Sequence, residues 1–378
     1  MKLTDVVNRI NGNVDRFTTD LEYYIGGEHF ESNELEVTQK GLLKENLGKL
    51  GFKFHFAFQD RDVIFMARNP HLRKAGMVRF AGLCSDASYI LRSKDESVLS
   101  QEYLAVMLQS NHFWDYCESH KVGSVNFANN WSSIANYEFD LPSPEYQKEV
   151  SDKVWAAYRL KKSYRQLLAA TEEMLQSQFI EMFGSVEDNI KSYSVKKVGD
   201  FADCYAGATP STKISAYWDN GHIPWMSSGE VHKGRVQDTD AKITQQGFDG
   251  CSTKMVPIHS IVVALAGQGK TRGTVAINDI ELCTNQSLCA IIPNEEVNYE
   301  YLYHNLRGRY RELRSMSGDV DGRGGLNLKH IQSIKVVVPP MEEQMRFVSI
   351  AQQADKSEFE LRKSIESIDA VIKSLINS

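Results

Sequence analysis

Apolar residues recur at alternating spacings of three and four over two long stretches of this chain. The stretch after Pro144 has no further Pro or Gly before Gly184, and the stretch after Pro340 has none at all. Such spacing places the apolar side chains along one narrow seam of a long α-helix, as in a coiled coil. The predicted seam residues are Val150, Val154, Ala157, Tyr164, Leu168, Thr171, Leu175 and Phe179 in the first helix, and Phe347, Ala351, Ala354, Leu361, Ile365, Ile368, Ile372 and Leu375 in the second.

A helix of this length with a single apolar seam needs a partner. We therefore expect the two helices to pack against each other as an antiparallel coiled coil, because a narrow seam suits helix pairing better than the broad face of a sheet. The alternative is that each helix covers the sheet of its own domain. A straight helix over 146–183 would be roughly 57 Å long, so the pair would hold apart whatever lies at its two ends.

The segments that precede the two helices have a strand-like pattern. Runs rich in β-branched residues, bounded by Gly, Pro, Asn or Asp, predict strands at 260–265, 273–277 and 334–338. One helix is expected within this region at 298–316, and the stretch 100–119 of the first half carries the same "EYL". Short strands, a few helices and two long helices together predict an α+β protein.

The two halves of the chain match each other in order. At an offset of 197 residues, "LPSPEYQ" at 141–147 meets "VPPMEEQ" at 338–344. At an offset of 199, "LCSDASYIL" from Leu83 meets "LCTNQSLCA" from Leu282. The other matched blocks are Gly76–Val78 with Gly273–Val275, and Gly27–Glu28 with Gly229–Glu230. Blocks in the same order with small drifts in offset indicate a tandem duplication, and hence two similar strand-rich domains related by a pseudo-twofold.

Composition narrows the class of protein. The 378 residues suit two ordinary domains, and 42% hydrophobic with 24% charged residues is the balance of a soluble globular protein. No apolar stretch approaches the ~20 residues of a membrane span, and the polar N-terminus lacks the apolar core of a signal peptide. Six cysteines without a CxxC pair predict a reduced, cytoplasmic protein without a metal site. A net charge of −6 is unlike most free-standing nucleic-acid binders, but leaves room for local basic surfaces or for partners that supply positive charge.

The stretch "ALAGQGKTRG" imitates a phosphate-binding P-loop without meeting its requirements. Gly269-Lys270-Thr271 resembles the end of such a loop, but Ala264 stands where the first Gly is needed. A P-loop also needs a helix that begins at the Lys, whereas "TRGTVAI" predicts a strand. The histidines, serines and carboxylates form no recognised metal or catalytic motif either. We therefore expect no catalytic residue, metal or cofactor, and retain an enzyme that uses a nucleotide at this stretch as the alternative.

Basic side chains gather in two predicted hairpins and two helical runs. Lys270 and Arg272 lie between two predicted strands, and the equivalent hairpin of the first half contains a second basic group. That group consists of Arg68, His71, Arg73 and Lys74. Denser basic runs occur at 159–165 and 307–314. For all four stretches, contact with phosphate and a merely solvated surface are both possible interpretations.

The segment 210–230 mixes aromatic rings with small polar side chains. We expect Trp218 and Trp225 to pack in the core or within the loop. The hydroxyl and amide groups between them are suited to reading base edges if the ligand is DNA. The positions that we favour for such contacts are Ser211, Thr212, Lys213, Ser227 and Ser228.

These blocks resemble a known family. "GATPS" at 207–211, "LAGQGKTRGTVAI", "CTNQSLCAIIP" and the junction "VPPMEEQ" look like successive blocks of a target-recognition domain in the DNA-specificity subunits of type I restriction–modification systems. The resemblance covers the whole chain, since that family has two such domains and two long helices. The first domain departs from the pattern, because it lacks the Gly-x-Thr-Pro block and begins close to "YYIGGEHF".

The resemblance implies target-recognition domains at 1–141 and 187–340, with long spacer helices at 142–186 and 341–378. Each domain would read one half of a bipartite double-stranded DNA target in the major groove. The helix pair would set the unread gap, with half-sites about 34–36 Å apart. A subunit of this kind has no active site. It would recruit two adenine methyltransferase subunits, which would share the phosphate contacts, and then motor–nuclease subunits.

The predicted DNA contacts are therefore Arg68, His71, Arg73 and Lys74 in the first domain, and Ser211, Thr212, Lys213, Ser227, Ser228, Lys270 and Arg272 in the second. A scaffold whose coiled coil happens to carry duplicated β domains is a further alternative, and it predicts no sequence-dependent DNA binding. Replacing Lys270 by alanine separates the enzyme from the reader. A nucleotide-using enzyme would lose hydrolysis, whereas a recognition domain would only bind DNA more weakly or with altered preference.

Overall fold

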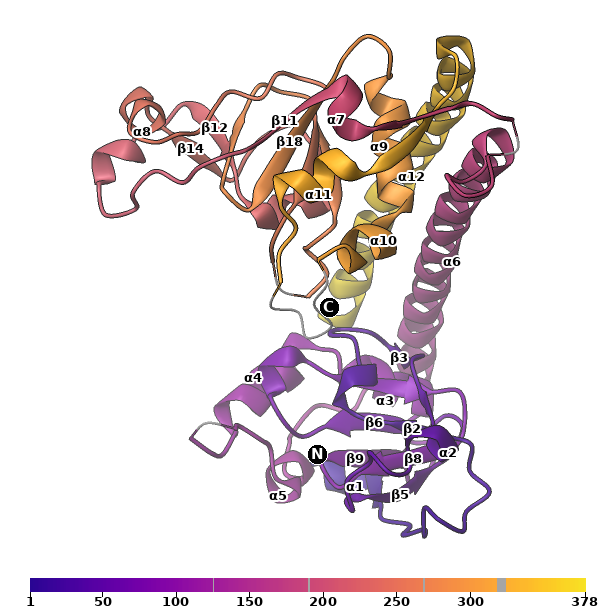
Figure 1. The fold of residues 1–378 in the computed structure, drawn as a ribbon. Coiled ribbons are helices and arrows are strands. Elements are labelled where there is room, and N and C mark those ends of the chain that lie inside the picture. The colour runs from indigo at the N-terminus through magenta and orange to yellow at the C-terminus, as the bar shows by residue number, and fades with distance from the viewer. Residues whose placement is uncertain (125, 190, 268, 318–323) are drawn as a thin grey trace. The chain divides into compact units, whose positions relative to one another are not determined.

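The computed structural model describes residues 1–124, 126–189, 191–267, 269–317 and 324–378. Their contacts group into two compact units: unit 1 is Met1–Leu167 with Leu361–Ser378, and unit 2 is Leu168–Glu360. Each unit contains one strand-rich domain and part of both long helices, which are α6 (Pro144–Phe183) and α12 (Met341–Ile376) (Figure 1). Both long helices are thus confirmed. Within the described ranges, no helix combines the length and the apolar character that crossing a membrane would need.

The domain of unit 1 is built on two sheets. The first has the strand order β1-β9-β6-β7-β3, in which β3 pairs parallel with β7 and the other pairs are antiparallel. The second has the order β4-β2-β8-β5. The strands are β1 (Val7–Ile10), β2 (Tyr23–Ile25), β3 (Glu36–Val37), β4 (Gly41–Leu42), β5 (Phe54–Phe58), β6 (Val63–Met66), β7 (Ala75–Val78), β8 (Gly82–Ser85) and β9 (Ser88–Ser93).

The domain of unit 2 repeats this plan. Its first sheet has the order β11-β18-β15-β16-β13, with β13 parallel to β16, and its second has the order β14-β12-β17. A third pair, β10 with β19, corresponds to an isolated bridge between Lys2 and Glu138 in unit 1. The strands are β10 (Ser194–Lys197), β11 (Ala202–Ala206), β12 (Ile223–Met226), β13 (Arg235–Val236), β14 (Ala241–Ile243), β15 (Ile261–Ala264), β16 (Val275–Asn278), β17 (Cys283–Thr284), β18 (Leu288–Pro293) and β19 (Lys335–Val338).

The shared topology identifies the two domains as copies of one design, as the sequence repeat predicted. The three strands expected at 260–265, 273–277 and 334–338 are present as β15, β16 and β19. Sheet register corrects one sequence match, in which Gly76–Val78 was aligned with Gly273–Val275. Met77 pairs with Val63, and Ile277 pairs with Ile261 at the same place in the sheet, so Met77 corresponds to Ile277.

Short helices connect the strands. The single helix expected over 298–316 is two helices, α9 (Tyr299–Gly308) and α10 (Tyr310–Ser315), separated at Arg309, whose φ and ψ are −105° and 24°. Their counterparts in unit 1 are α3 (Gln101–Met107) and α4 (Asn111–Ser119). The remaining helices are α1 (Leu3–Val6), α2 (Leu43–Asn46), α5 (Trp131–Ala135), α7 (Val198–Phe201), α8 (Gln245–Asp249) and α11 (Leu328–Ser333), with 3-10 turns η1 (Gly27–His29), η2 (Pro70–Leu72), η3 (Ser215–Tyr217) and η4 (Ser228–Lys233).

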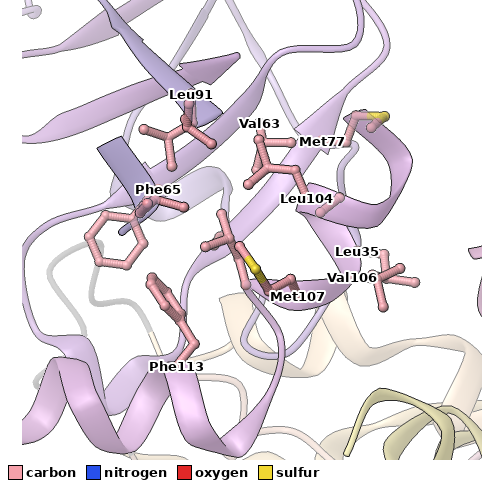
Figure 2. Packing of buried hydrophobic residues seen from close by; sticks show 14 of the residues in the cluster. Leu35, Val63, Phe65, Met77, Leu91, Leu104, Val106, Met107 and Phe113 are labelled. Carbon is pink, nitrogen blue, oxygen red and sulfur yellow. The ribbon is translucent and has the colours of Figure 1, made fainter. Parts of the chain in front are cut away.

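The core of unit 1 lies between its first sheet and the helices that cover it. Figure 2 shows Phe65 of β6 facing Phe113 of α4, and the two ring centroids are 5.7 Å apart. Leu104 and Val106 of α3 belong to the same buried cluster. Burying each such side chain contributes roughly 1.5–3 kcal/mol relative to leaving it exposed, so this layer holds the sheet that positions the domain's loops.

Within each unit, the two long helices share the buried core of the domain. In unit 1, Val154 near the beginning of α6 and Ile372 near the end of α12 belong to one cluster. In unit 2, Phe183 at the end of α6 and Phe347 near the beginning of α12 have ring centroids 5.8 Å apart. The beginning of each helix therefore lies with the end of the other, which is an antiparallel arrangement. Because the seam residues also join the domain cores, helix pairing and the covering of each domain by its helices both occur.

The repeated "P…EYQ" and "P…EEQ" junctions contain a buried glutamine with a defined role. In unit 1, the side-chain oxygen of Gln147 accepts a hydrogen bond from the backbone N–H of Ser100 at 3.0 Å. Its amide nitrogen donates to the carbonyls of Val98 at 2.8 Å and Pro142 at 3.0 Å. Ser100 caps α3, so one side chain fastens the start of α3 to the start of α6.

Gln344 makes the same three bonds in unit 2. It accepts from the N–H of Asn298 at 2.8 Å and donates to the carbonyls of Glu296 at 3.1 Å and Pro339 at 2.9 Å. Asn298 caps α9. In both copies the glutamine amide satisfies three backbone groups that no apolar residue of the same size can satisfy.

Replacing Gln344 by methionine is expected to lower the free energy of unfolding of unit 2 by about 3 kcal/mol, because it leaves buried backbone groups without partners. Gln352, an exposed residue on the same helix, provides the control: Gln352→Met should change stability by less than about 0.5 kcal/mol. Chemical denaturation of the full chain measures both. Equal effects of the two variants would contradict the assigned role.

Candidate nucleic-acid interface

The stretch that imitates a P-loop is the loop between β15 and β16. A strand, β16, follows it and begins at Val275, so no helix N-terminus is available to hold phosphate. The loop turns through Gly267, Gly269 and Gly273, whose φ angles of 142°, 62° and 82° favour glycine. The strand prediction is confirmed. Gln268, which also belongs to the motif, lies outside the described residues.

The two basic side chains of this loop have different surroundings. Lys270 is exposed, whereas Arg272 is only 3% exposed and donates to the carbonyl of Gly324. Arg272 therefore holds the loop in shape and is not available for surface contact, which corrects its predicted role. Two residues of α10 also position this loop, and their sequence pattern does not reveal it. The Arg314 guanidinium donates to the carbonyl of Gly269, and the Tyr310 hydroxyl donates to the carbonyl of Lys270 at 3.2 Å.

The segment "GATPS" starts at a close approach between two chain segments. A Cβ on Gly207 would lie 1.9 Å from the carbonyl oxygen of Thr284, on β17. The N–H of Ala208 donates to that same carbonyl at 2.9 Å. Glycine is therefore required at position 207 so that the segment can be tied to the second sheet.

The tryptophans of the segment pack and hold the polar residues in place. Trp218 and Trp225 meet edge to face with ring centroids 5.1 Å apart. The indole N–H of Trp225 donates to the carbonyl of Ala208 at 3.0 Å, and that of Trp218 to the carbonyl of Ser211 at 3.2 Å. The predicted packing role of both rings is confirmed. Ser211 is thereby fixed through its backbone, and its side chain and those of Thr212 and Lys213 are exposed.

Ser227 is the N-cap of the 3-10 turn η4, and Ser228 is the first residue of that turn. The N–H and hydroxyl of Ser227 both donate to the Glu230 carboxylate, at 2.8 Å and 3.1 Å. Ser227 thus begins the 3-10 turn η4, and its hydroxyl already has a partner. The other end of η4 approaches the β15–β16 loop, where His232 Nε2 lies 3.2 Å from Thr271 Oγ1. Two of the three predicted segments of this domain therefore meet at η4.

In unit 1, the β6–β7 loop contains the four predicted basic residues. Arg68 and His71 are exposed. The Arg73 guanidinium donates to the side chain of Asn111 at 2.8 Å, and Lys74 donates to the carbonyl of Gly27 at 2.7 Å. Arg68 and His71 are consequently the members of the group that present their charge or ring to solvent, while Arg73 and Lys74 hold the loop against its neighbours.

Cations of the two denser basic runs form ion pairs within the protein, which neither interpretation of the sequence anticipated. Lys161 is buried and paired with Glu34 at 2.8 Å. Arg307 pairs with Glu172 at 2.8 Å. Charge runs alone do not reveal such pairing, because the acidic partners lie more than a hundred residues away in the sequence.

A cluster of Glu300, His304 and Asp355 in unit 2 has the donor atoms that a metal site uses, all within 4.8 Å of one another. The Arg235 guanidinium already lies among them, 2.5 Å from Glu300 and 3.4 Å from Asp355. Burial lowers the pKa of Arg235, but the surrounding carboxylates outweigh this and raise it above its ordinary value. The cluster is therefore an ion-pair network with its own cation.

These loops offer hydroxyl, ammonium, guanidinium and imidazole groups on rigid sheets, which is the chemistry of phosphate and base-edge contact. Comparison with known proteins shows which proteins the chain resembles. Residues 190–368 match the model of the type I restriction modification DNA specificity domain. The EcoR124I/EcoR124II specificity subunit of Escherichia coli is 29% identical over 163 residues, 42% of this chain and 40% of that protein. The MjaIX specificity subunit of Methanocaldococcus jannaschii is 28% identical over 195 residues, 50% of this chain and 44% of that protein.

Solved structures share the architecture. The S subunit of a type I restriction–modification system from M. genitalium has a TM-score of 0.58 at 13% identity, covering 100% of this chain and 94% of that one. A chain from a type I R-M system, solved to explain assembly and conformational transition, has a TM-score of 0.55 at 16% identity and covers 100% and 95%. The chain therefore has the α+β fold of these subunits, with two strand-rich domains and two long helices.

Residues 190–368 thus resemble the type I restriction modification DNA specificity domain, and the chain is similar in sequence and fold to type I specificity subunits, as its motifs had indicated. The match with each curated relative spans less than half of that relative's length.

Proposed function

We propose that this chain is the DNA-recognition subunit of a type I restriction–modification complex. Each strand-rich domain reads one half of a bipartite double-stranded target, and the α6–α12 pair sets the gap between the halves. The chain contributes no catalytic group, and it recruits two adenine methyltransferase subunits and then motor–nuclease subunits. A nucleotide-using enzyme and a plain scaffold are not favoured by the family match.

One observation carries the proposal: the same order of the five-stranded sheet and the same glutamine junction occur twice, each followed by a long helix. Duplicated domains on paired helices are suited to two half-sites, because each copy can meet its own segment of the duplex. The family model covers the second copy, 190–368. The first copy has the same topology and is proposed to read the other half-site.

The proposed contacts are the exposed polar residues of the loops. They are Arg68 and His71 in unit 1, and Ser211, Thr212, Lys213 and Lys270 in unit 2. Ser228 is half-buried and is retained, whereas Ser227, Arg73 and Lys74 are proposed to support the loops from within. Since the chain has a net charge of −6, the methyltransferase subunits are proposed to supply many of the phosphate contacts.

Selection from a random duplex library tests the proposal. The purified complex of this chain with its methyltransferase should enrich one motif with two constant segments and an unread gap of fixed length. The methyltransferase alone should enrich none. A complex that forms and binds DNA without any enriched motif would favour the scaffold.

Lys270→Ala is expected to weaken DNA binding by the complex and to reduce the slope of log K against log salt by about 0.9, the contribution of one phosphate contact. Lys356→Ala removes an exposed lysine from α12 and serves as the control with an unchanged slope. Titrations at several salt concentrations give both slopes. An unchanged slope for Lys270→Ala would remove this residue from the interface, and loss of a nucleotide hydrolysis activity would favour the enzyme.

A further inference from the structure

Both units contain a charge triad that joins the domain to the two long helices. The domain residue of the triad precedes β3 in unit 1 and lies on α9 in unit 2. In unit 1, the Lys161 ammonium on α6 lies 2.8 Å from Glu34 of the domain and 2.6 Å from Asp369 on α12. Lys161 and Glu34 have side chains only 6% and 8% exposed. We call these three residues the unit 1 triad.

In unit 2, the cation belongs to the domain. The Arg307 guanidinium on α9 lies 2.8 Å from Glu172 on α6 and 3.4 Å from Glu358 on α12. The Glu358 side chain is 8% exposed and is therefore buried. These residues form the unit 2 triad.

The repeat fixes which residues correspond. Gln147 and Gln344 make identical bonds and are 197 residues apart. The same offset places Lys161 on Glu358, and Glu172 on Asp369. The two outer acids have similar side-chain exposures of 45% and 47%. At one position of the duplicated helix, a buried lysine has therefore been exchanged for a buried glutamate.

A second pair of corresponding domain residues differs in charge in the same sense, although the helix residues that they meet are not at corresponding positions. Glu36 on β3 and Arg235 on β13 hold the same sheet position, because they pair with Met77 and Ile277. Glu36 meets Lys162 of α6 at 3.0 Å, whereas Arg235 meets Asp355 of α12 at 3.4 Å.

The two docking edges are therefore opposite in charge. The domain of unit 1 presents carboxylates to a basic turn of α6. The domain of unit 2 presents guanidinium groups to an acidic turn of α12. Burial raises the pKa of Glu34, but the Lys161 and Arg165 cations outweigh this and hold it below its usual range, so the carboxylate is charged and depends on that turn.

We propose that this reversal of charge assigns each strand-rich domain to its own long helix. The two domains have the same fold and the same glutamine junction, so shape alone does not distinguish their helices. A domain of the unit 1 type placed on α12 would set Glu34 beside Glu358 and Glu172 instead of Lys161 and Asp369. Arg362, which the same offset places on Arg165, would then face three carboxylates. A domain of the unit 2 type placed on α6 would set Arg307 beside Lys161. Gathering like charges at a buried position in this way is strongly disfavoured, which favours the natural arrangement over the exchanged one.

The proposal concerns which domain packs against which long helix, and it does not depend on DNA being the ligand. It implies that a domain can be moved to the other position only together with the first half of its helix. A recognition domain joined to the wrong helix at the proline junction will not dock, although the junction itself is the same in both copies.

A double-mutant cycle in the full chain tests the proposal. Lys161→Glu should lower the melting temperature of unit 1 by about 10 °C, because the new glutamate then meets Glu34 and Asp369 and Arg165 alone pairs with Glu34 among these residues. Glu34→Lys combined with Lys161→Glu restores a pair of opposite charges with the cation on the domain and the acid on the helix, as in unit 2, and should recover most of that loss. Arg307→Glu with Glu358→Lys is the matched cycle for unit 2. Hydrogen exchange of peptides from each unit shows which of them is affected. A double variant as damaged as the sum of its single variants would overturn the proposal.

A chimera tests the proposal more directly, because Lys161→Glu should change the melting temperature of the chimera and of the natural chain in opposite directions. In a chain whose residues 1–141 are replaced by a copy of 196–338, the copied Arg307 faces Lys161. Lys161→Glu should raise the melting temperature of this chimera, although it lowers that of the natural chain. The same sign in both proteins would mean that position 161 serves stability in general and does not discriminate between domains.

Discussion

Replacing Gly207 by alanine is expected to abolish recognition through the second domain. The added Cβ would lie 1.9 Å from the carbonyl oxygen of Thr284, a separation that the backbone cannot tolerate. The segment must therefore leave β17, and the bond from Ala208 N–H to Thr284 is lost with it. We expect a loss of about 2–4 kcal/mol in the stability of unit 2. Ser211, Thr212 and Lys213 should lose their fixed positions, because Trp218 and Trp225 hold the same segment.

Gly229→Ala is the matched control, since a Cβ there meets only Ser227 Oγ at 3.9 Å. Denaturation of the full chain and DNA binding by the complex should both separate the two variants. If Gly207→Ala bound the selected motif as tightly as the natural chain, the segment would not belong to the reading surface.

Replacing Phe183 by alanine should have an effect of comparable size on the spacer. Phe183 is fully buried at the end of α6, and its ring meets those of Tyr301 and Phe347 at centroid distances of 5.1 Å and 5.8 Å. Removing a buried phenylalanine costs about 3–5 kcal/mol, because apolar contact is lost and a cavity remains. The end of α6 is thereby loosened from the domain whose position it is proposed to set.

Ile180, one turn earlier and 60% exposed, supplies the control variant Ile180→Ala. Hydrogen exchange of the α6 peptide reports the loosening directly, and calorimetry reports the loss of stability. Equal exchange rates in both variants would show that the last turn of α6 is not anchored by this ring.

The elements and their repetition were predictable because they leave periodic signals. Apolar spacings of three and four predict the long helices, and β-branched runs between turn residues predict strands β15, β16 and β19. The glutamine junction was found as a repeat, but its reason is a set of three hydrogen bonds that only the folded chain reveals.

The sequence did not predict which cationic side chains are buried and paired and which are exposed. Arg272 and Lys270 stand two residues apart in one loop, yet one is buried and the other exposed. Lys161 sits in a run that reads as a solvated helix face, but its partner Glu34 is supplied by a distant segment. A charge pattern states which groups are present, while burial and pairing depend on contacts between segments far apart in the sequence. The error in aligning Gly76–Val78 has a similar cause, because loop insertions shift the offset and only sheet register restores it.

Mapping of methylated adenine tests the central claim most directly. The chain would be expressed with the methyltransferase encoded beside it in a host without such marks, and the host genome sequenced for modified bases. The account predicts a single bipartite motif that disappears when this chain is omitted. Replacing the second domain by that of a specificity subunit with another target should change one half of the motif and leave the other half unchanged. Methylation that persists without this chain, or an intact complex that leaves no motif, would contradict it.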